Sequence, residues 1–375
     1  MCLLVGIITG YTILNGVDHM AVKVGLVGTG TVGGGCIDIL HNHKGDFLRH
    51  YGIDIELVRV CSREPEQAEA HGVADLFTED FNDIINDPEI DIVIELIGGT
   101  GIAKQVILDA LNAGKNVVTA NKAVMATSGE EIMALAEEKG VELAFEASVG
   151  GGIPIIGPLK HSLIANEISA VMGIVNGTTN YILTKMIKEN STFADALKEA
   201  QRLGYAEADP SADVDGKDTC RKICILADLA FGKAVDPDKV YTKGIREITL
   251  EDVATAEKHG CVIKLLGYAE RLADGNVAIF VSPCAVKKDS QLANIDDVYN
   301  GIMVGGDAVG DVVFYGRGAG KFPTASAVCG DVIDVARNCG KHNISWKDCG
   351  EDFVRGADDI GIKYLEGTDI LMPEC

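Results

Sequence analysis

Short apolar runs alternate with amphipathic stretches over the first 150 residues of the chain. The segments between the runs, such as GIAKQVILDALNAG and SGEEIMALAEEKG, have the spacing of amphipathic helices. Val- and Ile-rich strands that alternate with helices are typical of a parallel sheet with right-handed β-α-β crossovers. We therefore predict an α/β, doubly wound (Rossmann-like) parallel domain over residues 20–147. Its first strand begins at Ala21, and further strands are expected in 53–61, 89–99, 116–120 and 141–147.

The pattern changes after residue 147. SVGGGIPIIGPLK is rich in Gly and Pro and is typical of a hinge. Strand-like runs (ISAVMGIVNG, HGCVIKLLGYAERL, VAIFVSPCAV, DVVFYG) and helix-like segments follow. We predict an α+β catalytic and dimerisation domain that binds substrate over residues 148–315. The helix-like TASAVCGDVIDVARN is expected to return to the first domain, which about 316–345 would complete; 1–19 and 346–375 have no interpretable role.

Composition and charge narrow the class of protein. The net charge of −23 would repel nucleic acid and anionic membranes, although backbone dipoles can still bind a small anion. The eleven cysteines are scattered and form no C-x-x-C, which favours buried thiols in a reducing compartment. The opening MCLLVGIITGYTILNG lacks a basic region, and Met20 is an alternative start. We expect a cytoplasmic protein.

GTGTVG at 28–33 fits the pattern G-x-G-x-x-G and lies where a strand gives way to a helix. In this frame Gly28 permits a tight turn, Gly30 lets a pyrophosphate approach the backbone, and Gly33 allows the helix to pack closely. The helix N-terminus would then face the phosphates with free N–H groups. The turn predicts dinucleotide binding; the alternative is a Gly-rich turn kept for packing alone.

The end of the second strand bears on the choice of nucleotide. An acid that binds the adenosine ribose is expected there in an NAD site, but this chain has Ser62 and Arg63. A cation and a hydroxyl suit a 2′-phosphate better, which favours NADP(H). Two alternatives stay open: Arg63 as an ordinary surface residue, and use of both nucleotides.

The acidic stretch GYAEADPSADVDGKDTCRK at 204–222 permits three interpretations. As a calcium loop it fails, because aligning Gly216 with the sixth position puts Lys222 at the twelfth, where a Glu is required. As a solvated surface, Asp218 and Lys222 would form an exposed ion pair four residues apart on a helix. The third interpretation is an active site.

Hydride transfer to a carbonyl carbon places charge on the oxygen, which an ammonium group can stabilise and protonate. Lys222, held beside the Asp218 carboxylate on a helix, suits that task. If the substrate also carries an amino group, a further carboxylate must receive it. Glu207 and Asp213 lie a few residues upstream and are candidates.

Several motifs in this order resemble those of homoserine dehydrogenase: GLVGTGTVG, TANKA, FEASVGGGIPII, GIVNGTTNYILT, GYAEADPSADVDGKDTCRK and GAGKFPTASAV. The resemblance runs from about residue 21 to about residue 338. It implies interconversion of L-homoserine and L-aspartate 4-semialdehyde with NAD(P)(H), on the route to threonine and methionine. It also implies a homodimer, paired through the apolar strands around residues 261–315.

Site roles follow from the resemblance position by position. Lys222 would be the acid–base residue, supported by Asp218. Lys122 would lie between the nicotinamide and the substrate, as a cation suited to the substrate carboxylate or to a second proton-handling role. The implied substrate-binding residues are Glu207, Asp213, Tyr205, Gly177 and Thr178. The implied nucleotide-binding residues are Gly28, Thr29, Gly30, Thr31, Val32, Gly33, Arg63, Lys122 and Gly320.

Two further implications concern regulation and metal. The family holds a structural sodium ion, here through Glu146 and the backbone carbonyls of Val149, Gly151 and Ile153; the alternative is that these glycines are simply a hinge.

Many members carry a C-terminal ligand-sensing domain for threonine feedback. About 37 residues follow the last predicted helix here, too few for such a domain, so we do not expect feedback control by that means.

Three other functions compete with this interpretation. An aspartate-semialdehyde dehydrogenase needs a nucleophilic Cys with a His partner, and none of the eleven cysteines has that setting in the sequence. Another two-domain NAD(P) oxidoreductase of amino-acid or sugar metabolism would lack the segment NGTTNYIL. A non-catalytic nucleotide sensor would keep its ligand response after Lys222 is replaced.

Overall fold

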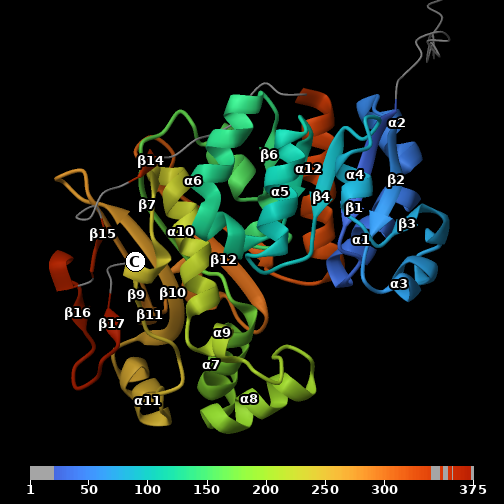
Figure 1. Ribbon diagram of the computed structural model, residues 1–375. Coiled ribbons are helices and arrows are strands. Elements are labelled where there is room, and N and C mark those ends of the chain that lie inside the picture. The colour runs from blue at the N-terminus through green and yellow to red at the C-terminus, as the bar shows by residue number, and fades with distance from the viewer. Residues whose placement is uncertain (1–20, 339–346, 349–353, 357, 373–375) are drawn as a thin grey trace, which may run out of the picture.

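The computed structural model describes residues 21–338, 347–348, 354–356 and 358–372. The predicted extension at 1–19, the alternative start at Met20 and part of the tail lie outside these residues. Figure 1 shows two groups of elements side by side, the first blue to cyan and the second green to red, with one late helix among the first group. No helix in the described part of the chain is long and apolar enough to span a bilayer.

The first group is built on a six-stranded, wholly parallel sheet. The strand order β3-β2-β1-β4-β5-β6 is the order of a doubly wound nucleotide-binding fold. The strands are β1 (Val22–Val27), β2 (Ile55–Cys61), β3 (Phe77–Thr78), β4 (Ile92–Glu95), β5 (Asn116–Thr119) and β6 (Leu143–Ala144). The prediction of this fold class is confirmed. The sequence missed β3, whose two residues are too few to show a periodicity.

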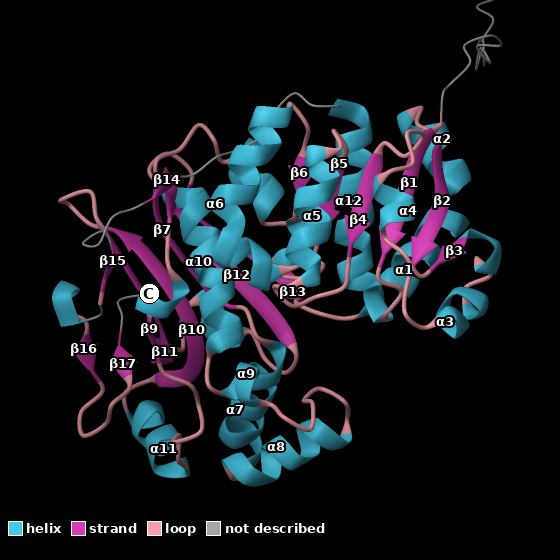
Figure 2. Cartoon of the chain, viewed as in Figure 1, coloured by secondary structure: helices cyan, strands magenta, loops and turns pink. Residues whose placement is uncertain are grey.

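Helices connect these strands and cover the sheet (Figure 2). They are α1 (Thr31–Asn42), α2 (Lys44–Tyr51), α3 (Pro65–Ala70), α4 (Asn82–Ile85), α5 (Ile102–Asn112) and α6 (Lys122–Lys139). The predicted late helix is α12 (Lys321–Asn338), which lies among the elements of the first sheet (Figure 1). Its buried Val328, Val332 and Val335 belong to the same apolar cluster as Cys36 and Ile37 of α1. The chain therefore crosses to the second group and returns.

The second group is built on a mixed sheet in the order β13-β12-β7-β10-β11-β17-β16. Its strands are β7 (Ile168–Ile174), β10 (Cys261–Arg271), β11 (Val277–Lys287), β12 (Tyr299–Gly306), β13 (Gly310–Arg317), β16 (Lys363–Tyr364) and β17 (Leu371–Met372). The short strands β9 (Tyr241–Thr242) and β15 (Val354–Arg355) also pair with β11, and β8 (Lys233–Ala234) pairs with β14 (Lys347–Asp348). The described part of the tail thus extends the edge of this sheet, which the sequence did not predict.

The helices of the second group are α7 (Gly177–Glu189), α8 (Phe193–Arg202), α9 (Ser211–Val214), α10 (Lys217–Phe231) and α11 (Leu250–Lys258). Single 3-10 turns occupy Ala74–Leu76, Glu146–Ser148, Pro237–Lys239, Gln291–Asn294 and Asp358–Ile360, and a π turn occupies Pro158–Ser162. The seven described cysteines are all free thiols and all buried, as the sequence analysis expected.

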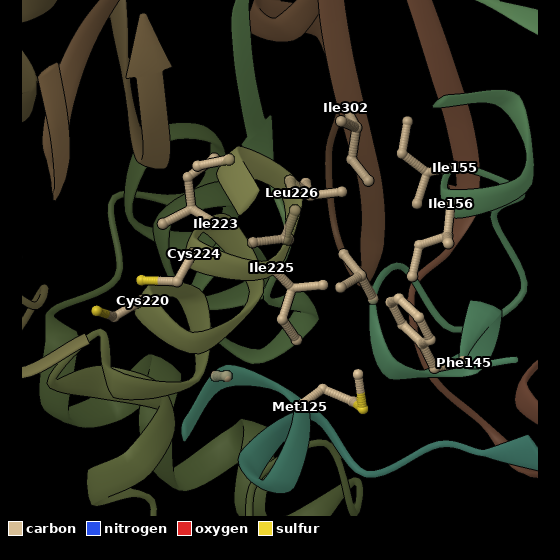
Figure 3. Packing of buried hydrophobic residues seen from close by; sticks show 14 of the residues in the cluster. Met125, Phe145, Ile155, Ile156, Cys220, Ile223, Cys224, Ile225, Leu226 and Ile302 are labelled. Atoms are coloured by element: carbon tan, nitrogen blue, oxygen red, sulfur yellow. The ribbon is translucent and has the colours of Figure 1, made fainter. Parts of the chain in front are cut away.

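Helix α10 lies at the centre of the molecule, between α6 and the second sheet (Figures 1 and 2). Its Ile225 and Leu226 are fully buried and belong to one apolar cluster with Met125 of α6 and Phe145 (Figure 3). Each fully buried side chain of this size stabilises the fold by about 1.5–3 kcal/mol. A helix packed on this many sides holds its side chains in fixed positions, which matters because α10 carries Lys222.

Candidate active site

The dinucleotide turn follows β1 and opens α1. Gly28 has φ +106°, and a Cβ there would lie 2.7 Å from the Leu96 carbonyl. A Cβ on Gly33 would lie 1.9 Å from the Gly28 oxygen. Gly30, in contrast, faces open space. The fold itself therefore requires glycine at 28 and 33, whereas no contact within the described chain requires it at 30.

A cavity of about 530 Å³ opens at this turn, at the carboxyl ends of the parallel strands. Ligands of doubly wound folds bind at this edge, where the strand order reverses. Gly28, Thr29, Gly30 and Arg63 line the cavity together with Ser62, Glu64, Gln67, Glu79 and the loop after β4. Thr31, Val32 and Gly33 lie in α1, and Gly320 directly precedes α12; these four do not line it.

The loops after β4 and β5 are tied to each other beside this cavity. The buried Glu95 carboxylate accepts a hydrogen bond from the Thr119 hydroxyl at 2.7 Å. The Asn121 side-chain amide donates to the Gly99 carbonyl at 2.8 Å, and its oxygen caps α6. Lys122 is the first residue of that helix. In the sheet β4 lies between β1 and β5, so the strands that lead to the dinucleotide turn and to Lys122 are about 10 Å, or two strand spacings, apart.

Lys222, Asp218 and Lys122 form one charge cluster, in which Lys122 is the partly exposed member. The Lys222 ammonium lies 2.7 Å from one oxygen of the Asp218 carboxylate, and the Lys122 ammonium lies 2.8 Å from the other. Lys222 and Asp218 are only 8% and 5% exposed. The interpretation of this pair as an exposed surface ion pair is therefore wrong. Lys122 joins the cluster from α6, so the cluster bridges the edge of the nucleotide-binding sheet and α10.

The Lys222 ammonium keeps one donor free. Besides its contact with Asp218 it donates to the Val175 carbonyl at 2.6 Å. An ammonium has three N–H groups, so one has no partner among the described residues. Burial lowers the pKa of Lys222, an effect that Asp218 opposes and Lys122 reinforces. Burial would raise the pKa of Asp218, but Lys222 and Lys122 outweigh it and hold that pKa well below its usual range.

Asp213 joins this cluster through an amide that the sequence analysis did not single out. The Asn176 side chain donates to Asp213 at 2.7 Å and to Asp218 at 2.9 Å. Burial raises the pKa of Asp213, and the hydrogen bond from Asn176 opposes that rise. Asp213 lies in α9, Asp218 in α10 and Asn176 before α7, so three separate segments meet here.

Glu207 and Tyr205 lie on the exposed part of the acidic stretch. The Glu207 carboxylate is exposed and has no hydrogen-bond partner in the described part of the chain. Tyr205 is 44% exposed, and its carbonyl accepts a hydrogen bond from the Thr178 hydroxyl at 2.6 Å. Gly177 and Thr178 are the first residues of α7. The acidic stretch is thus a solvated loop at its start and a buried charge cluster at its end.

The candidate sodium residues surround the turn after β6. The Glu146 carboxylate accepts three backbone N–H bonds, from Ile155 at 2.6 Å, Ile156 at 2.9 Å and Gly157 at 2.6 Å. Val149, Gly151 and Ile153 are all buried. Among the described residues, no hydrogen bond ends on the carbonyls of these three. The segment therefore offers a cation three backbone oxygens, but its carboxylate, Glu146, already accepts three hydrogen bonds.

Comparison with known proteins bears on the family. Residues 154–333 match the family described as Homoserine dehydrogenase, and residues 28–146 match Homoserine dehydrogenase, NAD binding domain. A homoserine dehydrogenase of Pseudomonas aeruginosa is 47% identical over 316 residues, covering 84% of this chain and 72% of that protein. The chain belongs to the homoserine dehydrogenase family. The resemblance stated from the motifs is confirmed, and the chain is an NAD(P)-dependent oxidoreductase.

Solved homoserine dehydrogenase structures share the fold. That of Thiobacillus denitrificans has a TM-score of 0.84 at 44% identity, covering 90% of this chain and 78% of its own. A hyperthermophilic archaeal homoserine dehydrogenase in complex with NADPH has a TM-score of 0.73 at 27% identity, covering 87% and 100%. The NAD-binding domain match and the NADPH complex support a nicotinamide nucleotide as cofactor. Neither matched family is that of an aspartate-semialdehyde dehydrogenase or of a nucleotide sensor, which are two of the three competing interpretations.

Proposed function

We propose that this homoserine dehydrogenase interconverts L-homoserine and L-aspartate 4-semialdehyde with Lys222 as the acid–base residue. One observation carries the assignment: Lys222 is a buried ammonium with one N–H free among the described residues, held by Asp218 and linked through it to Lys122 at the nucleotide edge. A buried cation with a free donor is suited to an oxygen on which charge develops.

When bound, the nicotinamide ring supplies the hydride acceptor in one direction and the hydride donor in the other. In homoserine oxidation the neutral Lys222 amine accepts the hydroxyl proton while the carbon loses hydride and the C=O bond forms. In the reverse direction the Lys222 ammonium gives that proton to the oxygen as hydride reaches the carbonyl carbon. Asp218 holds the Lys222 amine in a fixed orientation and stabilises its charged form.

The rest of the amino acid would be bound by charges on either side of Lys222. Glu207, with a carboxylate that has no partner in the described chain, and the half-buried Asp213 suit the substrate ammonium. Lys122 suits the substrate carboxylate. Its ammonium would then contact both that carboxylate and Asp218. Tyr205 and the start of α7 at Gly177 and Thr178 would border the same space. These roles follow the family resemblance position by position.

The direct test is absorbance at 340 nm with purified protein, NADP⁺ or NAD⁺, and L-homoserine from neutral to alkaline pH. Reduction of nucleotide that depends on L-homoserine, and is absent with L-serine, is the expected result. L-serine tests the chain length, because its hydroxyl lies one carbon closer to the amino group. Absence of signal with both nucleotides across this range would contradict the proposal.

Arg63 is proposed to favour NADP(H) over NAD(H). It lines the nucleotide cavity as the second residue after β2, although Glu64 and Glu79 line the same cavity and offset its charge. Arg63→Ala is expected to raise KM for NADP⁺ by about 10- to 100-fold and to leave KM for NAD⁺ within about threefold, because a guanidinium forms charge-assisted bonds to a phosphate. Arg49→Ala, on exposed α2, makes the same charge change and should alter neither KM. Equal changes in KM for NADP⁺ and NAD⁺ would mean that Arg63 does not distinguish a 2′-phosphate from a 2′-hydroxyl.

We also propose a structural sodium ion at the turn after β6. Three carbonyls without hydrogen bonds among the described residues, at Val149, Gly151 and Ile153, support it, since a hard cation takes oxygen ligands. The Glu146 carboxylate retains about one lone-pair site beyond its three N–H bonds. The ion would brace the turn that leads into the second group of elements.

Sodium is expected to raise the melting temperature by about 2–4 °C in NaCl relative to choline chloride at equal ionic strength, because it would bind the folded state alone. Glu146→Gln should remove that difference, whereas Glu137→Gln at the exposed end of α6 should keep it. Identical melting curves for the wild type in the two salts would leave the segment as a hinge.

A homodimer is proposed from the family resemblance. Within the chain itself β10 and β11 are already buried almost throughout. The edge strand β13 is the more exposed part of the region expected to pair, with Tyr315 58% exposed. Light scattering should give about twice the chain mass of 39.6 kDa at micromolar concentration. A single species at the chain mass would contradict this assembly. The cytoplasmic location stays a prediction.

A further inference from the structure

Asn176 lies at the end of β7, directly before α7, and is 5% exposed. Its side-chain oxygen accepts from the Thr179 backbone N–H at 2.9 Å and from the Thr179 hydroxyl at 3.0 Å. Its side-chain nitrogen donates to Asp213 and Asp218 at 2.7 and 2.9 Å. These partners fix the orientation of the amide, because carboxylates can receive only its N–H groups and the Thr179 N–H can reach only its oxygen.

The two carboxylates that Asn176 joins need a donor between them. Asp218 already holds both Lys222 and Lys122. Asp213 forms no ion pair among the described residues, and Asn176 is the one hydrogen-bond donor that reaches its side chain there. Two carboxylates side by side repel each other, and a buried carboxylate without a donor is costly. The amide therefore determines where Asp213 points.

We propose that Asn176 is a positioning residue that sets the substrate amino-group site and the proton-transfer site in a fixed relation. It does so by tying Asp213 to Asp218, and through Asp218 to Lys222. The inference rests on the proposed function, since it takes Asp213 as a carboxylate for the substrate ammonium. It extends that function to a residue that touches neither the hydride nor the proton.

Asn176→Asp separates this role from helix capping. Aspartate caps a helix as well as asparagine does, so the bond to the Thr179 N–H is retained. Both donors are lost, and a third carboxylate faces the same two cations. The charged groups at this point are then Asp213, Asp218, Lys122 and Lys222, together with the carboxylate that the substitution introduces. A cluster of three carboxylates and two lysines holds a proton more readily than one of two carboxylates and two lysines. The pH below which activity falls should therefore rise.

The expected result for Asn176→Asp is at least a 100-fold loss of kcat/KM for L-homoserine at neutral pH. The acid limb of its kcat/KM profile should move up by at least about one pH unit, with KM for the nucleotide within about threefold of the wild type. Asn176→Ser keeps a neutral cap and loses the two-armed donor. It should show a smaller loss, of about tenfold, mainly as a raised KM for L-homoserine.

Thr192→Ala is the matched control for capping, because Thr192 caps α8 in the same way away from the charge cluster. It should lower the melting temperature without moving the acid limb or either KM.

If both Asn176 variants lower only the melting temperature, Asn176 is a helix cap and the inference is overturned. If Asn176→Asp does not fold, Asn176→Ser decides by its KM for L-homoserine. A wild type without homoserine-dependent turnover would overturn the proposed function and this inference with it; an active wild type with unmoved variants overturns the inference alone.

Discussion

Lys222→Met is expected to lower kcat for L-homoserine oxidation by about 10³-fold or more while nucleotide affinity stays within about threefold. General acid–base catalysis by a positioned group contributes about 10²- to 10⁴-fold, and the ammonium also stabilises charge on the oxygen in the transition state. Lys222 lies on α10 and does not line the nucleotide cavity, so binding of the cofactor should not depend on it. Steady-state kinetics at 340 nm and nucleotide titration by fluorescence measure the two quantities.

Methionine is close to lysine in length and apolar, so it fills the buried space that the lysine stem leaves. Asp218 keeps Lys122 and the Asn176 amide as partners after the substitution, and the variant is therefore expected to fold. Lys217→Met makes the same change on the exposed first residue of α10 and should keep wild-type kcat. A Lys222→Met enzyme that retained more than a tenth of wild-type kcat would exclude Lys222 as the acid–base residue.

The features that could be predicted from the sequence are those with a local signal. Alternating strands and helices indicated the parallel sheet, and GTGTVG between a strand and a helix located the dinucleotide turn. Asp218 and Lys222 are four residues apart on one helix, so their contact follows from helix geometry alone. The glycines at 28 and 33 follow from backbone contacts that the motif implies.

The contacts that were missed join residues far apart in the chain. The Lys122–Asp218 pair links α6 to α10, and Asn176 reaches Asp218 from a position 42 residues away. Glu95 and Thr119, which tie two loops at the nucleotide edge, are ordinary polar residues in their own segments. Such partners depend on how the strands are ordered in space, which no periodicity records. The same reason explains why the tail strands on β11 were not foreseen.

Burial was the property of the acidic stretch that the sequence left undecided. Five acids in the twelve residues from Glu207 to Asp218 fit a solvated loop, and up to Asp209 the stretch is largely exposed. From Asp218 onward the helix enters the core between α6 and the second sheet, and its polar groups become buried. Whether a charged pair is buried decides its chemistry, because burial shifts its pKa values and water no longer screens it.

Asp218→Asn is expected to move the pH dependence of the reaction to lower pH by about one to three units, the range typical of an adjacent opposite charge. Burial already lowers the pKa of Lys222, and Asp218 is the group that chiefly opposes this effect. Without the carboxylate, Asp213 still opposes burial and the Lys122 charge, but the main opposing group is gone, so the pKa of Lys222 falls further. Homoserine oxidation needs the neutral amine, which forms as pH rises through that pKa, so its rising limb appears at lower pH. Reduction of the aldehyde needs the ammonium, so its activity is lost at lower pH as well.

Profiles of kcat/KM against pH in both directions measure these limbs, because kcat/KM reports the ionisations of the free enzyme. Asparagine has the shape of aspartate, and Asp215→Asn, three residues upstream, provides the same chemical change at a site that pairs with Arg246 instead. The control should leave both limbs in place. Limbs that moved to higher pH would show that the carboxylate does not stabilise the charged lysine. Limbs that did not move would show that the titrating group is not Lys222, whatever the loss in rate, because Asp218 contacts Lys222 at 2.7 Å and its charge cannot be removed without changing the pKa of that amine.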